Sequence, residues 1–103
     1  MLVELSLLVL GRGTHLSDEI AEALKIIHAS GLPYLLTPLG TCIEGEWDEV
    51  MPLIRQCHER MRKLSPHVMT TIRIEDEAGE RDKLRRNVAV VEQKAGYAFK
   101  SAS

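Results

Sequence analysis

The sequence predicts an α+β fold in which a four-stranded antiparallel sheet carries two helices on one face. The chain has 103 residues, of which 45% are hydrophobic and 27% charged, as in an ordinary globular domain. Segments with a two-residue apolar period alternate with segments that have a helical period, and glycine or proline separates them. The length suits one modest core, so we expect residues 1–103 to form a single domain.

The first strand is predicted from the alternation over residues 2–10. Val3 and Leu5 fall on one face of this segment, and Glu4 and Ser6 fall on the other. The first face is apolar along its length, so we expect it to lie against helices. The second face mixes polar and apolar side chains.

A helix and a hairpin are predicted next. Ser17 is a suitable N-cap, two acidic residues fill the first turn and Gly31 is a natural stop, which places a helix over 17–30. Proline and glycine then punctuate two short β-compatible segments over 34–37 and 41–46. We expect these two segments to pair as a hairpin.

The second half of the chain repeats the pattern. A 3.6-residue apolar stripe predicts a helix from Trp47 to a Ser-Pro break. Strong alternation predicts a strand over 67–76, and a final helix over 81–95 ends at Gly96. This order is the split βαβ repeat of a ferredoxin-like βαββαβ sandwich with an extra C-terminal helix.

The opposite face of the sheet is expected to stay open, because two helices cover only one face. We take the strands over 2–10 and 68–76 as the central ones. The open face collects a mixed set of side chains: Glu4, Ser6, Leu8, Leu10, Thr37, Cys42, Glu44, Met69, Thr71, Arg73 and Glu75. Such a patch is typical of an association surface, so we expect homodimerisation by sheet packing; a solvated face is the alternative.

Composition and charge argue against several classes of function. The net charge of −2 gives no electrostatic footprint for nucleic acid, and the two strands taken as central carry no aromatic residue that could stack on a base. The sequence contains neither a signal-peptide pattern nor a run of about 20 apolar residues. Its two cysteines form no disulfide framework, so we expect a cytoplasmic protein.

Catalytic and metal-binding motifs are weak. The four histidines and two cysteines lack the spacing of a zinc site, so no metal is expected. No nucleophile elbow occurs in the sequence. Cys42 could serve as a nucleophile, but the sequence identifies no base to partner it.

A polar set on the open face is the remaining candidate for a binding site. Its hydroxyl groups can donate or accept hydrogen bonds, and its carboxylate can accept them from an amino-heterocycle or meet a cation. Its guanidinium could bind an anion or pair with a carboxylate on a neighbouring strand. The set comprises Ser6, Thr37, Glu44, Thr71 and Arg73.

The segment 37–50, which contains Gly-Thr-Cys-Ile-Glu-Gly-Glu-Trp, resembles the small thiamine-binding, YkoF-like family of ferredoxin-like proteins. The resemblance extends to the opening strand at 3–6 and to 70–74. It implies a homodimer formed by sheet packing, often paired again into a tetramer, and a site for thiamine or its hydroxymethyl-pyrimidine part near the sheet interface. The pocket residues that it implies are Ser6, Thr37, Thr41 and Glu44. Trp47 could form an aromatic wall or pack between helix and sheet edge.

The function expected from these observations is binding without catalysis. We expect a homo-oligomeric carrier or sensor of thiamine or its pyrimidine part, with no other cofactor. One alternative is a small enzyme that uses Cys42 or Glu44. A second alternative is a structural or regulatory module that only associates with itself.

Overall fold

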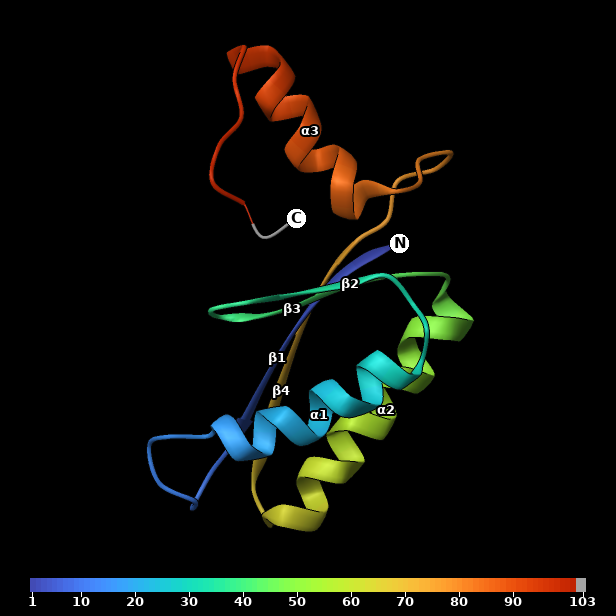
Figure 1. Cartoon of the computed structure of the whole chain (residues 1–103). Helices are drawn as coiled ribbons and strands as arrows, with labels where there is room; N and C mark the ends of the chain where they lie inside the picture. The colour runs from blue at the N-terminus through green and yellow to red at the C-terminus, as the bar shows by residue number, and fades with distance from the viewer. Residues whose placement is uncertain (102–103) are drawn as a thin grey trace.

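The structure, a computed structural model, describes residues 1–101 and confirms the predicted order of elements (Figure 1). The strands are β1 (Leu2–Val9), β2 (Tyr34–Thr37), β3 (Gly40–Glu44) and β4 (Val68–Glu75). The helices are α1 (Ser17–Ala29), α2 (Trp47–Leu64) and α3 (Lys83–Ala95). Helices α1 and α2 cover one face of the sheet, and α3 lies apart on the other side of the hairpin (Figure 1). No described helix has the length and apolar content needed to cross a bilayer.

The sheet has the strand order β2-β3-β1-β4, with every neighbouring pair antiparallel. The strands β1 and β3 are therefore central, and the prediction that 68–76 is a central strand is wrong. Alternation shows which face a residue occupies but not which strand lies next to which, because neighbours depend on contacts distant in sequence. The argument against base stacking still holds, since β3 also lacks aromatic residues.

The division of the sheet into a covered and an open face is confirmed. Val3, Leu5 and Val9 of β1 are buried against the helices, while Glu4 and Ser6 are exposed. The core is aliphatic apart from one thiol. From the other elements it takes Ala23, Ile27, Ile43, Val50, Leu53, Ile54, Cys57 and Met61.

The helix ends differ in part from expectation. Leu16, not Ser17, is the N-cap of α1, and it makes no side-chain capping bond. Helix α2 begins with a capping box, in which the Glu46 N–H donates to Oε1 of Glu49 at 2.9 Å. Helix α3 buries none of its residues, and its apolar side chains Val88 and Val91 are 37% and 57% exposed.

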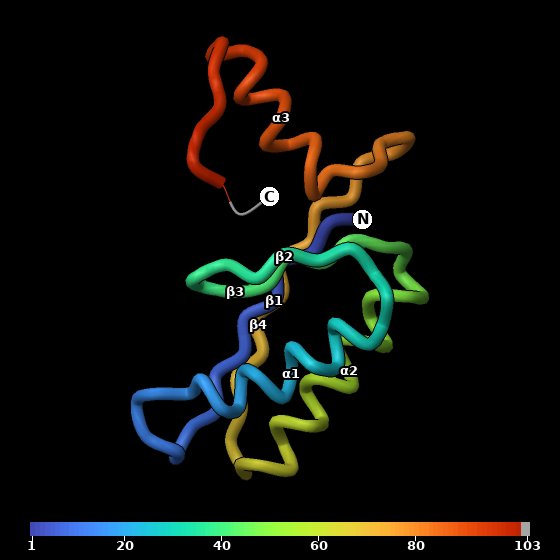
Figure 2. Tube along the Cα trace, in the orientation of Figure 1, coloured from blue at the N-terminus to red at the C-terminus, as the bar shows by residue number. Residues whose placement is uncertain are grey.

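The strands differ in length, and this leaves a gap beside β1. Strand β1 pairs with β4 over its whole length, but its ladder with β3 ends at Leu5↔Thr41. Beyond this point the β2–β3 hairpin diverges from β1 and its tip projects from the body of the protein (Figure 2). At Gly40, just beyond the end of the ladder, the two backbones are still in close contact, because an added Cβ would lie 2.9 Å from the carbonyl oxygen of Leu5. Glycine is therefore required where the hairpin leaves β1.

Candidate functional site

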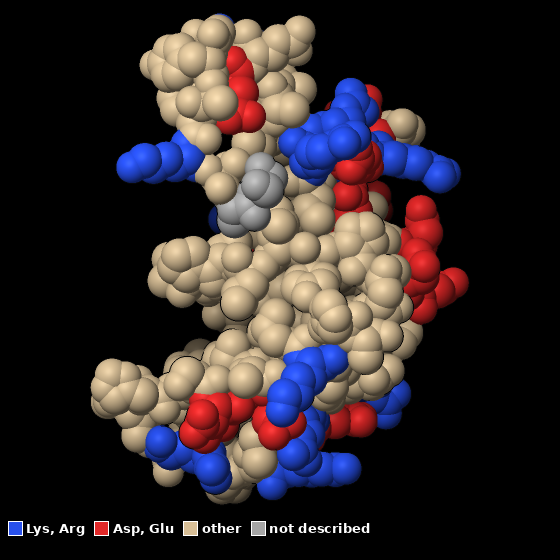
Figure 3. Space-filling view, viewed as in Figure 1, with Lys and Arg blue, Asp and Glu red and all other residues tan. Residues whose placement is uncertain are grey.

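The gap between β1, the β2–β3 hairpin and α1 is a cavity of about 490 Å³, called here the hairpin cavity. Leucine and isoleucine side chains from β1 and α1 form most of its wall. In the space-filling view the surface is hollowed between the hairpin tip and the loop that leads into α1 (Figure 3). Four hydroxyl residues also line it, namely Ser6, Thr14, Thr37 and Thr41. An apolar cavity with a few polar groups is typical of a small-molecule site.

The hairpin turn places two of these hydroxyl residues. The Thr37 hydroxyl donates to the carbonyl of Gly40 at 2.9 Å and accepts from its N–H at 3.1 Å, which closes the turn. Thr41 follows directly and lies opposite Leu5 on the helix side of the sheet, where it is only 4% exposed. The turn therefore fixes the position of a nearly buried threonine at the base of the hairpin cavity.

The backbone of β1 supplies a further polar group to the hairpin cavity. The N–H of Leu10 donates to His67 beside β4 at 2.9 Å, and the carbonyl of Leu5 points toward Gly40 of β3. Because backbone groups alternate in direction along a strand, Leu7 also directs its N–H and C=O toward the β3 side. The ladder with β3 has already ended there, so this peptide edge faces the gap.

Arg12 holds the loop that carries Thr14. Its Nε donates to Oε1 of Glu19 at 2.7 Å, and its Nη1 donates to the carbonyl of Leu64 at 3.0 Å. The hydrogen bond from Arg12 lowers the pKa of Glu19. One guanidinium thus ties the loop to the start of α1 and to the end of α2, which keeps this wall of the hairpin cavity in place.

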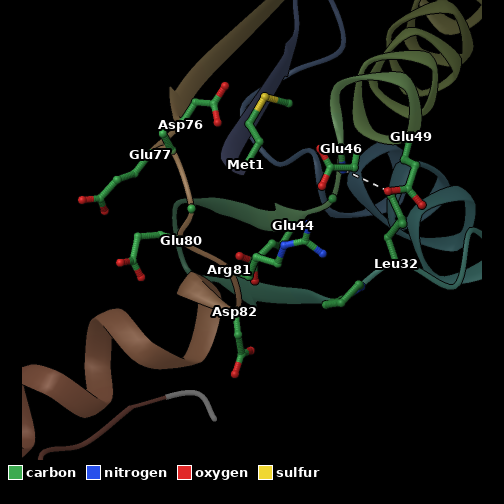
Figure 4. Close-up of a pocket in the computed structure, with 14 residues that line it drawn as sticks. Met1, Leu32, Glu44, Glu46, Glu49, Asp76, Glu77, Glu80, Arg81 and Asp82 are labelled. Atoms are coloured by element: carbon green, nitrogen blue, oxygen red, sulfur yellow. Dashed lines mark hydrogen bonds between the residues drawn. The ribbon is translucent and has the colours of Figure 1, made fainter.

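Glu44, another predicted site residue, lies in a different cavity, of about 530 Å³ (Figure 4). Seven acidic residues line it: Glu44, Glu46, Glu49, Asp76, Glu77, Glu80 and Asp82. The Glu44 carboxylate accepts the backbone N–H groups of Lys83 at 2.7 Å and Leu84 at 3.1 Å. It therefore acts as a cap for α3 across 39 residues of sequence.

Five of the other carboxylates of this acidic cavity, those of Glu46, Glu49, Glu77, Glu80 and Asp82, also have structural partners. Glu46 and Glu49 form the capping box of α2. Glu77 pairs with Lys83, Glu80 with Arg86 at 2.9 Å and Asp82 with Arg85 at 2.8 Å. Hydrogen bonds from Lys83 and Asn87 lower the pKa of Glu75, and its acidic partners raise the pKa of Lys83. These charges hold α3 and α2 in position.

Thr71, Arg73 and Cys42 lie on the open face of the sheet. Thr71 is the direct neighbour of Ser6 on β1, so it adjoins the hairpin cavity from the open side. Arg73 is largely exposed and lies 3.8 Å from Glu4. Burial, and secondarily the Glu4 carboxylate, raises the pKa of Cys42, so its thiol stays protonated at neutral pH.

The structure therefore divides the predicted site residues among several places. Ser6, Thr37 and Thr41 meet in the hairpin cavity. Glu44 lies in the acidic cavity, and Trp47 is 57% exposed at the start of α2 and lines neither cavity. Sequence reasoning missed Thr14, the apolar wall from α1 and the Leu7 backbone edge. The unequal lengths of the predicted strands were the signal that could have revealed the gap.

Metal binding finds no support in the geometry. Within residues 1–101, the structure brings together no group of three or more histidine, cysteine, aspartate or glutamate residues suited to hold an ion.

The thiol of Cys57 is buried, which raises its pKa to about 11, and it donates to the carbonyl of Ala23 at 3.7 Å. It is thus a core side chain.

Comparison with known proteins agrees with the fold. Residues 3–92 match the family model described as thiamine-binding protein. The chain belongs to this family. Among curated relatives of this thiamine-binding family member, a UPF0045 protein of Eremothecium gossypii is 35% identical over 95 residues, which cover 90% of each chain. A UPF0045 protein of Mycobacterium bovis is 32% identical over 94 residues, covering 90% of this chain and 92% of the relative.

Solved structures share the fold of this thiamine-binding family member at low identity. A hypothetical protein of Methanocaldococcus jannaschii superposes with a TM-score of 0.83 at 20% identity, covering 89% of this chain and 95% of that one. A Thermotoga maritima protein, assigned provisionally to thiamine biosynthesis or salvage, superposes with a TM-score of 0.72 at 20% identity. That match covers 92% of this chain and 94% of the other.

Proposed function

We propose that this protein binds thiamine through its aminopyrimidine part in the hairpin cavity, as a homo-oligomeric carrier or sensor in the cytoplasm. The family supports a thiamine-related ligand. The observation that carries the choice of site is the meeting of Ser6, Thr37 and Thr41 beside the Leu7 backbone edge in one largely apolar cavity. The other candidate residues lie outside that group, so we give them no primary role in ligand binding. They are Glu44, Trp47, Thr71 and Arg73.

The chemistry of an aminopyrimidine suits this cavity. The ring is flat and apolar on its faces, and its amino group and neighbouring ring nitrogen present a donor beside an acceptor. The N–H and C=O of Leu7 offer the complementary pair, and hydroxyls can satisfy the remaining nitrogens. The leucine and isoleucine wall would cover the ring faces. Binding in this way needs no bond to form or break.

The residues that a small enzyme would use argue for binding rather than catalysis. Cys42 has a raised pKa, so little thiolate is available for attack at neutral pH. Glu44 is occupied by two backbone N–H groups of α3. Both cysteines are free thiols, which fits a reducing compartment.

Self-association is supported by the apolar side chains on the open face. Leu8 of β1 and Met69 of β4 are opposite neighbours there and are 41% and 53% exposed. Adjacent exposed apolar side chains of this kind favour association. We propose that two copies pack these faces together.

Calorimetric titration with thiamine, and separately with hydroxymethyl-pyrimidine, tests the ligand and the site. We expect both to bind, and an analogue with a carbonyl in place of the 4-amino group to bind poorly. Thr41→Val should weaken binding by about tenfold, as expected for a lost hydrogen bond in a desolvated site. Thermal unfolding of the variant checks that it folds.

Thr71→Val locates the site by comparison, because Thr71 adjoins Ser6 from the open face. Full affinity in Thr71→Val together with loss in Thr41→Val supports the hairpin cavity. The reverse pattern would move the site to the open face. No heat and no thermal shift with either compound at millimolar concentration would remove thiamine as the ligand.

A further inference from the structure

The tip of the β2–β3 hairpin, which projects from the body of the protein (Figure 2), carries apolar side chains. Leu36 is 54% exposed, Leu39 is 90% exposed, and Pro38 lies between them in the sequence. All three residues line the hairpin cavity. Isolated exposed leucines are common, but exposed apolar side chains that gather beside a hollow are typical of ligand-binding sites. The tip therefore has the composition of a surface that covers something.

The strand register fixes the face of the hairpin on which Leu36 lies. Leu36 pairs with Thr41, and Thr41 pairs with Leu5, which is buried against the helices. Directly opposed residues of paired strands lie on the same face of a sheet, so Leu36 is on the helix side. Ile20 and Leu24 of α1 also line the hairpin cavity. The cavity thus has one apolar wall on the helix and another on the hairpin.

Leu36 is also the cross-strand neighbour of the hydroxyl that we propose to bind the ligand. The Cβ atoms of directly opposed residues lie about 4.5–5.5 Å apart. A ring that forms a hydrogen bond with Thr41 would therefore lie beside Leu36. Leu35, the preceding residue, lies on the opposite face of β2 and does not line the hairpin cavity.

The base of the hairpin is fixed, but its tip is held only within the turn. At the base, the N–H of Glu44 donates to the carbonyl of Pro33 at 3.0 Å, and the ladder with β1 continues as far as Thr41. Beyond Thr41 the ladder with β1 no longer restrains the hairpin, and hydrogen bonds between Thr37 and Gly40 hold the turn together. The turn can therefore move as a unit about the end of the ladder.

The opposite wall of the hairpin cavity does not share this freedom. Ala23 and Ile27 of α1 are fully buried in the core. Arg12 ties the start of the same helix, through Glu19, to the end of α2. A movement that narrows the hairpin cavity must therefore come from the hairpin tip and not from α1.

We propose that the hairpin tip is a lid that closes toward α1 over the ligand, with Leu36 against one face of the ring and Leu39 across the entrance. The inference rests on the proposed function, because it takes the hairpin cavity as the ligand site. Closing would remove apolar surface of both leucines from water, which is favourable, and the ring would supply the surface against which they pack. Leu36 is thus the residue that holds a flat ring against the α1 wall.

Calorimetry and stopped-flow kinetics with hydroxymethyl-pyrimidine test the contact from Leu36. Leu36→Ala should weaken binding about tenfold, as expected when part of the apolar contact of a leucine is lost. The change should appear mainly as faster dissociation. Leu36→Met, which keeps the side-chain volume, should bind as the wild type does. Leu35→Ala is the matched control, because it makes the same truncation on the opposite face of the same strand, and it should leave the affinity unchanged.

Methyl NMR with a soluble paramagnetic agent tests the movement of the tip. The agent broadens the signals of methyl groups that are accessible to solvent. When hydroxymethyl-pyrimidine is added, the methyl groups of Leu36 and Leu39 should become protected, while those of Leu35 should not change. Protection of Leu39 is the decisive reading, since a small ring that reaches Thr41 would not cover this 90% exposed side chain unless the tip moved.

Four results would overturn the lid, and they are distinguishable from one another. Wild-type affinity in Leu36→Ala, together with loss in Thr41→Val, would remove the lid and leave the proposed function in place. Equal loss in Leu35→Ala and Leu36→Ala would assign the effect to the stability of the hairpin. Leu39 methyl groups that stay accessible in the complex would show that the tip does not close. If the wild type bound neither thiamine nor hydroxymethyl-pyrimidine, the proposed function would fail and the lid would fail with it.

Discussion

Gly40 is the residue that sets the distance between the hairpin and β1. We predict that Gly40→Ala lowers stability by about 1–3 kcal/mol, the usual cost of overpacking, because its Cβ would meet the backbone oxygen of Leu5 at 2.9 Å. Chemical denaturation measures this loss. Leu39→Ala, in the same turn but 90% exposed, should change stability little. Equal stability of Gly40→Ala and wild type would mean that the hairpin yields without cost.

Glu44 shows that one carboxylate can hold a whole helix in place. We predict that Glu44→Ala speeds amide exchange at Lys83 and Leu84 by about fivefold, which corresponds to a typical cap loss of about 1 kcal/mol. Glu46→Ala removes the cap of α2 instead and should leave those two amides unchanged. Unchanged exchange in Glu44→Ala would show that α3 is held by other contacts.

Single residues also mark the limits of prediction from sequence. Ser6, Thr37 and Thr41 were recognised as pocket candidates, and the structure brings these three together. The partner of Glu44 was not foreseeable, because it is a pair of backbone N–H groups 39 and 40 residues later that any sequence could supply. Ser17 is an acceptable cap by type, yet it is already the first helical residue of α1, and Leu16 occupies the cap position.

At the scale of elements, α3 is attached by charge, and its attachment should depend on pH. The folded protein lowers the pKa of Glu75 below 4.5 and raises that of Lys83 above 10.5. The stabilisation of α3 that the ionised Glu75 provides is therefore complete above about pH 4.5 and is lost as pH falls through the lowered pKa. The stabilisation of α3 that the protonated Lys83 provides is complete below pH 10.5 and is lost only as pH rises through the raised pKa of Lys83.

We predict that amide protection along α3 is constant between those limits and falls in acid before the core strands lose theirs. Hydrogen exchange read by NMR across a pH series measures this. Glu75→Gln should weaken α3 at neutral pH and flatten the acid response. If α3 and the core lost protection at the same pH in wild type, the helix would be part of the cooperative unit.

The kinds of element were predictable from period and punctuation, but their arrangement was not. The amphipathic stripe of α2 and the alternation in β1 agree with the structure, because each reports local burial. Strand neighbours and the end of the β1–β3 ladder depend on contacts between distant segments. For that reason β4 was misplaced at the centre of the sheet, and the hairpin cavity was missed.

For the molecule as a whole, ligand binding and pairing of copies should both raise thermal stability by mass action. A ligand at about 100 times its Kd stabilises the folded state by about 2.7 kcal/mol when it binds only that state. Association adds a dependence on protein concentration that the ligand alone does not cause. Melting curves over a grid of protein and thiamine concentrations therefore separate the two effects.

The hairpin extends past its last contact with β1, and its tip takes no part in the aliphatic core. Insertions or deletions at that tip would change the segment that covers the hairpin cavity, while the residues of the core stayed the same. Selectivity for larger or smaller molecules could thus evolve by changing loop length alone. In this architecture, adapting the protein to a new compound need not endanger its ability to fold.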